Sequence, residues 1–175
     1  MRLIWAFFVF TSLWAEPLMA KNEVHTYGFV EKATLVDKEL TLSAKLDTGA
    51  KSASLNASNI TEMDVDGVPY LRFTVPSKEK SYIFECRYIG KVKIKVRANE
   101  ANPGALAVTP IKRPVVLLNI QLGNQIKAIR VNLTNRKRFI YPLLLGRDAI
   151  IAFNGAVDPA LTFTLKSKSR TQNEK

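Results

Sequence analysis

An acid, a hydroxyl and a glycine stand together at Asp47, Thr48 and Gly49, directly after an alternating run of apolar and polar residues. A carboxylate at the end of a strand can act as a general base on water when a second carboxyl shares its proton. The same tripeptide is also common in turns, because Asp bonds to nearby backbone and Gly accepts unusual dihedral angles. The tripeptide alone leaves both interpretations open.

The neighbours of Asp47 favour the catalytic interpretation. Leu46 and Ala50 are apolar, so the sequence predicts a core-like environment for the carboxylate. A structural turn seldom places an acid there, because burying a carboxylate without partners is costly. Downstream, the segment Leu143–Ile150 (LLLGRDAI) has the pattern of a buried strand that ends at a glycine and leads into a short helix.

The elements that must position these motifs are mostly strands. Period-two alternation, or an apolar run of strand length, marks five segments. They are Leu40–Leu46, Leu71–Val75, Val92–Val96, Val115–Leu122 and Ile126–Leu133. Gly123-Asn124-Gln125 between the last two is a hairpin signal, and Phe139–Gly146 is a nearly continuous apolar run, typical of a strand buried on both faces. We expect an all-β domain, closed or sandwiched, with one short helix.

At these residues the chain resembles the retropepsin-like aspartic peptidases, in which an Asp-Thr/Ser-Gly loop is paired with a strand that ends in Gly before a short helix. It is most similar to a bacterial family of small retropepsin-like proteins whose members often carry the label ATP-dependent zinc protease. The resemblance runs from about Gly28 to Leu165. The shared motifs are AKLDTGAKSASLNA (44–57), Asp66-Gly67 before YLRF, Arg113-Pro114, LLLGRDAI (143–150) and VDP (157–159).

The resemblance implies a retropepsin-like (acid protease) closed barrel and an aspartic endopeptidase that acts on a peptide or protein substrate. Asp47 would be the catalytic residue. Because the chain has one Asp-Thr-Gly, Asp47 would meet its twin across the two-fold axis of a homodimer. The residues expected to support the loop are Thr48, Gly49, Leu145, Gly146 and Arg147. Asp148 is expected to cap the short helix or to pair with an arginine rather than to catalyse.

Cofactor chemistry finds no support in the composition. The chain has one His, His25, one Cys, Cys86, and no Gly-rich phosphate loop. We therefore expect neither a metal nor a nucleotide, despite the family label. Cys86 is expected to be a buried small apolar residue, since no second Cys is present for an intramolecular disulfide.

Residues 1–20 have the order of a secretory signal peptide: Arg2, the apolar run Leu3–Ala15, then Ala20. We expect cleavage near Ala20, with Ala15 as a second site, leaving a peptidase domain at 21–165 and a polar tail at 166–175. A retained membrane anchor is the alternative, but the run is shorter than the ~20 residues that a spanning helix needs. The expectation is an exported, periplasmic protein without a stable anchor.

The whole chain has a net charge of +11, and the positive charge is concentrated in its second half. Between Ala101 and Asn173 the only acids are Asp148 and Asp158. Such a surface attracts anionic partners, and for an exported protein acidic peptides or envelope polymers are better candidates than nucleic acid. A solvated basic face that aids solubility explains the charge equally well.

Two further hypotheses about function stay open. One is a non-catalytic retropepsin-fold module whose basic face binds an acidic envelope component. The other is an accessory β-protein in which Asp47 is a turn residue. If the chain is a peptidase, we expect either the Asp66-Gly67 hairpin or the Asn102-Pro103-Gly104 turn to project over the site as a cover.

Overall fold

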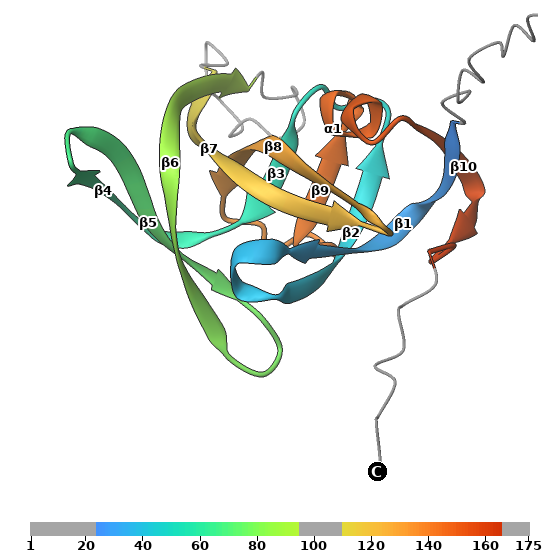
Figure 1. Ribbon diagram of the computed structural model, residues 1–175, viewed down its shortest axis with the longest axis horizontal. Helices are drawn as coiled ribbons and strands as arrows, with labels where there is room; N and C mark the ends of the chain where they lie inside the picture. The colour runs from blue at the N-terminus through green and yellow to red at the C-terminus, as the bar shows by residue number, and fades with distance from the viewer. Residues whose placement is uncertain (1–23, 95–109, 166–175) are drawn as a thin grey trace, which may run out of the picture.

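The computed structural model describes residues 24–94 and 110–165 (Figure 1). The expected signal peptide, the polar tail and the Asn102–Gly104 turn lie outside these ranges. The elements are β1 (His25–Leu35), the 3-10 helix η1 (Val36–Lys38), β2 (Leu40–Asp47), β3 (Ala53–Asn56), β4 (Ser58–Val65), β5 (Val68–Pro76), β6 (Ser81–Ile94), β7 (Ile111–Leu122), β8 (Gln125–Thr134), β9 (Leu143–Gly146), α1 (Arg147–Ala152) and β10 (Gly155–Thr162). No helix within the described ranges is long and apolar enough to cross a membrane.

Six strands close into a barrel. They follow the order β1-β2-β9-β3-β8-β7, and β7 pairs back onto β1 through Ala33↔Leu122 and Leu35↔Ile120. β10 lies outside the barrel against β1, whereas β6, β5 and β4 continue the sheet beyond β7 as a projecting wing (Figure 1). The expected all-β closed barrel with a short helix near the C-terminus is confirmed.

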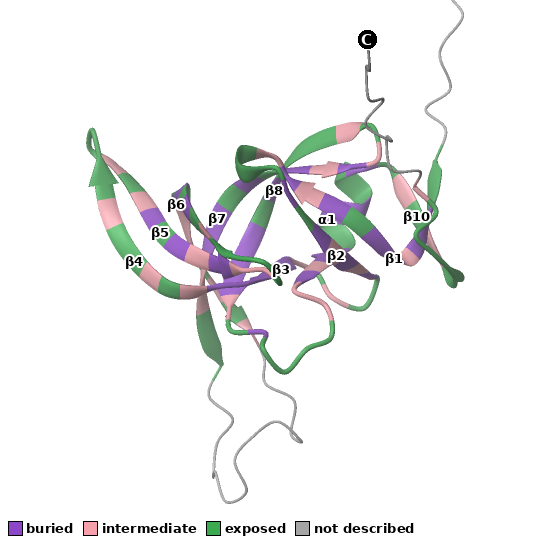
Figure 2. Cartoon of the chain, turned by 90° about the horizontal axis from the view of Figure 1, so that it is seen from below, coloured by how far each residue is buried: buried purple, intermediate pink, exposed green. Residues whose placement is uncertain are grey.

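The barrel core is built by the period-two pattern of its strands. On β2, residues Leu40, Leu42, Ala44 and Leu46 are all buried, as the alternation predicts. The wing has its own buried residues on β5, where Phe73 stacks on Phe84 with ring centroids 5.6 Å apart. Figure 2 shows buried segments alternating with exposed ones along the strands. Cys86 is buried and free, as expected.

The apolar run Phe139–Gly146 is a strand only over its last four residues. The expectation of a buried strand from Phe139 is wrong, since Phe139 and Ile140 are 55% and 89% exposed. The Phe139 amide donates to the Arg136 carbonyl (2.8 Å), which closes a turn, and Pro142 has no N–H for a ladder. The connection between β8 and β9 is therefore a surface loop despite its apolar residues.

A buried carboxylate fastens the C-terminal segment to β1. Glu31 is fully buried, and its carboxylate accepts hydrogen bonds from the amides of Gly28 (2.8 Å), Thr164 (2.9 Å) and Leu165 (3.3 Å) and from the Thr164 hydroxyl. These donors satisfy the charge that burial would otherwise leave unpaired. The segment after β10 is thus part of the fold as far as Leu165.

Glu31→Gln should lower the free energy of unfolding by about 2 kcal/mol, because the amide NH₂ would face donors that now bond to a carboxylate oxygen. Urea denaturation measures the change. Glu39→Gln is the matched control: Glu39 is exposed, so its replacement should stay within about 0.5 kcal/mol of the parent. Equal stability of the two variants would contradict a clamp at Glu31.

Candidate active site

Asp47 is the last residue of β2 and lies beside the end of β9. The two strands are parallel, with Leu46 opposite Leu145 and Asp47 opposite Gly146. Leu46 and Leu145 are buried, so they anchor the two strand ends in the core. The expectation that the Asp-Thr-Gly tripeptide lies beside the strand Leu143–Gly146 is confirmed.

The loop after Asp47 is held by its own backbone and by the start of α1. The Gly49 amide donates to Asp47 Oδ1 (3.0 Å), and the Ala50 amide donates to the Asp47 carbonyl (3.2 Å). The Arg147 guanidinium donates to the carbonyls of Thr48 (2.9 Å) and Gly49 (3.3 Å), while the Arg147 amide donates to the Ala50 carbonyl (2.8 Å). Arg147 therefore bonds directly to the loop that it is expected to support. The Thr48 side chain is exposed, and its expected support of the loop stays a prediction.

The carboxylate of Asp47 is not in a core-like environment, contrary to the expectation from its neighbours. Its side chain is 27% exposed, because it points to the outer face of β2 while Leu46 takes the inner face. Asp47 Oδ2 accepts a hydrogen bond from Lys45 Nζ at 3.1 Å. Partial burial alone would raise the pKa of Asp47, but bonds from Lys45 and the Gly49 amide, with the Lys45 charge, hold that pKa below its ordinary value.

Asp47 lies at a groove of about 910 Å³, which is large enough for a segment of peptide. Seven basic side chains and only two acidic ones, Asp47 and Asp148, line it within the described ranges. Five of the basic residues are Lys51 on the β2–β3 loop, Lys91 and Lys93 on β6, Arg113 on β7 and Arg130 on β8. A groove lined in this way has a positive potential.

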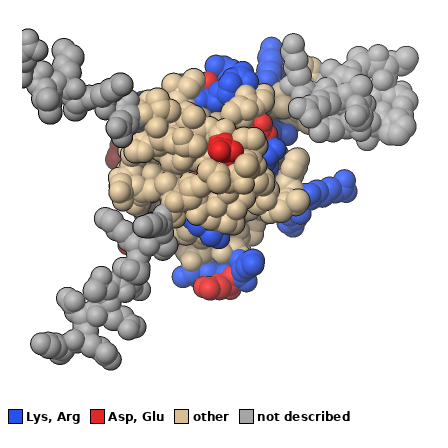
Figure 3. Space-filling view, turned by 90° about the vertical axis from the view of Figure 1, so that its right-hand side faces the viewer, with Lys and Arg blue, Asp and Glu red and all other residues tan. Residues whose placement is uncertain are grey.

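The positive charge is not spread evenly over the molecule. Figure 3 views the molecule from the side on which β10 lies in Figure 1, and most of that face carries neither Lys nor Arg; the basic side chains gather at its edges. The groove collects basic residues from strands that are far apart in the sequence. The basic region predicted between Ala101 and Asn173 includes the four groove arginines, whereas the groove lysines, Lys51, Lys91 and Lys93, lie outside it.

Arg136 also lines the groove and is buried, with 6% exposure. Its guanidinium lies over the Phe139 ring (4.3 Å to the centroid), and its Nε donates to the Tyr141 carbonyl (3.3 Å). Burial and the nearby Arg113 lower the pKa of Arg136, and the charge of Asp47 opposes that shift. Arg136 thus belongs to the electrostatic surroundings of Asp47, a role that the exposed-looking sequence NRKRF did not indicate.

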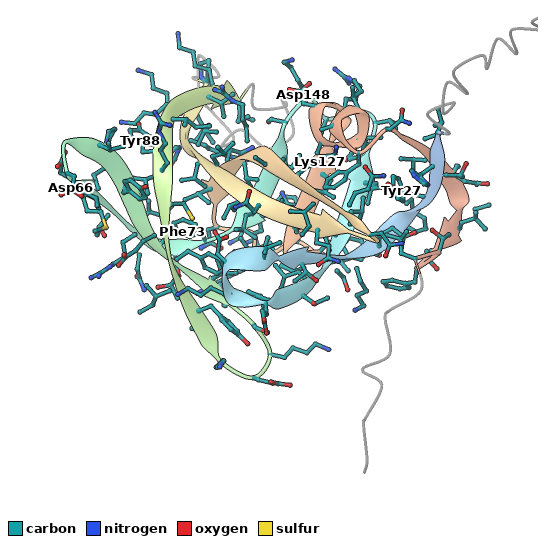
Figure 4. All side chains as sticks on the ribbon, in the orientation of Figure 1. Tyr27, Asp66, Phe73, Tyr88, Lys127 and Asp148 are labelled. Carbon is teal, nitrogen blue, oxygen red and sulfur yellow. The ribbon has the colours of Figure 1, made fainter. Side chains whose placement is uncertain are left out.

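The expected role of Asp148 is corrected. Asp148 makes no helix cap; α1 begins after Gly146 without a side-chain cap bond, and Asp148 Oδ1 instead pairs with Lys51 Nζ (3.3 Å) rather than with an arginine. Of the two turns expected as a cover, Asp66-Gly67 is not part of the groove lining, and Asn102-Pro103-Gly104 lies outside the described residues. Figure 4 places Asp66 at the far tip of the β4–β5 hairpin, well away from Asp148. The end of β6, Gly90–Ile94, lines the groove instead.

Metal ligands do not cluster in the part of the chain that the structure describes. No group of three or more His, Cys, Asp or Glu side chains there could hold a metal ion. In the groove the two carboxylates of Asp47 and Asp148 are paired with Lys45 and Lys51. The chemistry that this arrangement offers is that of a hydrogen-bonded carboxylate in a basic groove.

Comparison with known proteins identifies the family. A family model described as RimB-like, retropepsin-like aspartic endopeptidase RimB, matches residues 26–168. The chain belongs to the RimB-like family. The match spans the whole barrel of this RimB-like protein together with both motifs of the candidate site.

A solved structure and two curated relatives add to this result. The RimB-like chain is 68% identical to a Legionella pneumophila protein of unknown function whose crystal structure matches with a TM-score of 0.71, covering 81% of this chain and 98% of that one. It is also 30% and 31% identical to proteins named probable alpha-L-glutamate ligase from Shewanella pealeana and Shewanella halifaxensis. Those matches cover 76% of this chain but only 28% of the ligases' length.

Gly146→Ala should destabilise the protein by about 1–3 kcal/mol and loosen the Asp47 loop. A Cβ at position 146 would lie 2.7 Å from the backbone carbonyl oxygens of both Lys51 and Ser52, so these carbonyls would have to move. Thermal unfolding measures the loss of stability. Faster hydrogen exchange at the Gly49 and Ala50 amides would show that the Asp47 loop is less rigid. Unchanged exchange at those amides would show that the loop does not depend on this close approach.

Proposed function

We propose that the chain is an aspartic endopeptidase whose site forms when Asp47 of two copies meet. The observation that carries the proposal is the carboxylate of Asp47, partly exposed at the groove and bonded to the Gly49 amide of its own loop (3.0 Å). Gly146 and Arg147 hold this loop, as the matching family would require. Family membership supports the same conclusion.

The dimer follows from the number of carboxyls that the reaction needs. Two carboxyls in contact cannot both ionise easily, so one keeps a proton while the other is a general base. The chain contributes one Asp-Thr-Gly, and the second acid in the groove, Asp148, is paired with Lys51 on another part of its wall. A two-fold axis beside Asp47 supplies the missing carboxyl.

In the proposed reaction the two Asp47 carboxyls share one proton at the start of each cycle. The ionised Asp47 takes a proton from water as the water oxygen bonds to the scissile carbonyl carbon, and the protonated Asp47 of the second copy donates to the carbonyl oxygen. When the tetrahedral intermediate collapses, the C–N bond breaks and the amine leaves with a proton from the pair. The pair titrates as a unit, so the rate should follow a bell in pH.

The groove supports an acidic peptide as the substrate. Its basic side chains outnumber its acidic ones by seven to two among the described residues, which favours anionic ligands. The relatives named probable alpha-L-glutamate ligase share most of this domain, and we extend the connection with glutamate to a glutamate-rich peptide here. Export to the periplasm is part of the same proposal and rests on the signal-peptide pattern of residues 1–20.

Binding without catalysis is the second candidate, because the basic groove would hold an acidic envelope component even in a single copy. The two functions differ in what one copy can do. A peptidase needs the dimer, whereas a binding module works as a monomer. Sedimentation of the purified protein with and without an acidic peptide therefore belongs to every test of the function.

Asp47→Asn should reduce kcat by at least about 10²–10⁴-fold and leave the fold and peptide binding intact, because Asn cannot take a proton from water. Cleavage of a peptide library, followed by mass spectrometry, measures the loss. Asp66→Asn is the matched control: it changes an exposed turn residue at φ 53°, where Asn is well tolerated. A wild-type rate in Asp47→Asn would refute the peptidase; binding of acidic peptides without any cleavage would support the binding module.

Replacing Lys91 and Lys93 together by Gln should lower kcat/KM for a glutamate-rich peptide by about tenfold and change a neutral peptide much less, because groove cations attract the substrate. The deficit should shrink at high salt, which screens the wild-type attraction. Lys78→Gln is the control, since the turn that holds Lys78 precedes β6 and Lys91–Lys93 lie near the other end of that strand. Equal losses for both peptides would argue against charge selection by the groove.

A further inference from the structure

Lys45 and Asp47 stand on the same face of β2, since side chains of a strand repeat every second residue. Ala44 and Leu46, which alternate with them, are buried in the barrel. Lys45 Nζ lies 3.1 Å from Asp47 Oδ2, and the two side chains are 43% and 27% exposed. The proposed general base therefore carries its own cation, supplied by the same strand.

Four of the other charged groups around Asp47 bond to partners other than its carboxylate. From the β2–β3 loop, Lys51 pairs with Asp148 at the start of α1 (3.3 Å). Arg147, also from α1, donates to the backbone carbonyls of Thr48 and Gly49.

Two more arginines come from the remaining walls. Arg136, between β8 and β9, lies over Phe139 and donates to Tyr141, and Arg113 of β7 donates to Asn132 Oδ1 (3.4 Å). The remaining groove cations, on β6 and β8, are Lys91, Lys93 and Arg130. Within the described ranges, the ion pair of Asp47 is the one with Lys45.

This ion pair conflicts with what an aspartic pair needs at rest. Catalysis requires one proton shared by two carboxyls, and that proton stays because two adjacent negative charges repel. Two copies of the chain would bring two ammonium groups together with the two carboxylates. Each ammonium compensates one carboxylate, so the repulsion that retains the proton is weakened and the resting pair loses it more readily.

We propose that Lys45 is a positioning and specificity-determining residue: its ammonium holds Asp47 as a carboxylate in the resting site and moves to a carboxylate side chain of an acidic substrate when that substrate binds. The inference rests on the proposed peptidase function and concerns the same site. The ammonium is partly exposed on a flexible stem, so it can change partner without a change in the backbone. Once it has moved, the two Asp47 carboxyls take up one proton from solvent and share it.

The consequence is that an acidic substrate side chain acts on kcat and not only on KM. A neutral peptide leaves Lys45 on Asp47 and meets a pair that lacks its proton over much of the pH range. An acidic peptide removes that ammonium and restores the shared proton. Selectivity would then lie in the protonation state of the catalytic pair as well as in the attraction of the groove.

The test compares wild type with Lys45→Met on a neutral and a glutamate-containing peptide from pH 3 to pH 8. Removal of the ammonium raises the pKa of the pair, so the proton is kept to higher pH and the alkaline limb for the neutral peptide should move up by about half a pH unit. The kcat ratio of acidic to neutral peptide at neutral pH should fall by about threefold or more, which is the same shift expressed as a rate.

Lys32→Met is the charge-matched control. Lys32 lies on β1, opposite Ser43 of β2, and its ammonium donates to Ser43 Oγ (3.0 Å) rather than to Asp47. Its loss should leave both the alkaline limb and the kcat ratio in place. Titration of the Asp47 carboxyl by carbon NMR in both variants gives a readout independent of turnover, in which only Lys45→Met should raise the pKa.

The outcomes separate this inference from the peptidase proposal. If wild type cleaves neither peptide at any pH, the proposed function fails. Suppose instead that wild type cleaves and Asp47→Asn does not, but Lys45→Met keeps the wild-type alkaline limb of the pH–rate profile and the wild-type kcat ratio of acidic to neutral peptide. The peptidase proposal then stands, and the role of Lys45 is overturned. A shifted alkaline limb with an unchanged kcat ratio in Lys45→Met overturns the proposed move of the ammonium from Asp47 to the substrate. An equal shift of the alkaline limb in Lys32→Met shows a general effect of net charge and overturns a specific role of Lys45.

Discussion

The parallel pairing of β2 with β9 is the constraint on which the candidate site depends. It places Gly146 opposite Asp47, and the absence of a side chain there lets the carbonyls of Lys51 and Ser52 approach the β9 backbone. The loop after Asp47 can then bond to the first residues of α1. A parallel pair needs a long crossover connection. Here the connection between β2 and β9 includes the wing strands and the strands β7 and β8 that close the barrel.

Electrostatics at this site works at two ranges. The basic lining of the groove acts over several ångströms and favours anionic ligands of any sequence. The contact between Lys45 and Asp47 acts at hydrogen-bond distance and lowers the pKa of one carboxyl. The first concerns the charge of a ligand, and the second concerns the ionisation of a single side chain. Lys45 is not itself a lining residue, but it adjoins the groove through its bond to Asp47, which is.

Sequence reasoning identified the barrel and the meeting of the two motifs because both depend on local signals. The alternation of apolar and polar residues over Leu40–Leu46 fixes which face of β2 is buried. The apolar strand that ends at Gly146 pairs directly with β2. The exposure of Phe139 and Ile140 was missed because apolar character alone indicates burial, while the turn at Arg136 and Pro142 decides where the strand begins. The partner of Asp148 and the burial of Arg136 depend on contacts between distant segments, which no local pattern reports. The Lys45–Asp47 contact was within reach, since their spacing places them on one face of a strand.

The clamp at Glu31 also determines how the barrel would carry a mechanical load. β1 and β10 are parallel, so Val24 and the residues that follow β10 leave the ladder at opposite ends. A force that pulls these ends apart acts along the strands, and the ladder bonds and the bonds to Glu31 share the force instead of breaking one after another.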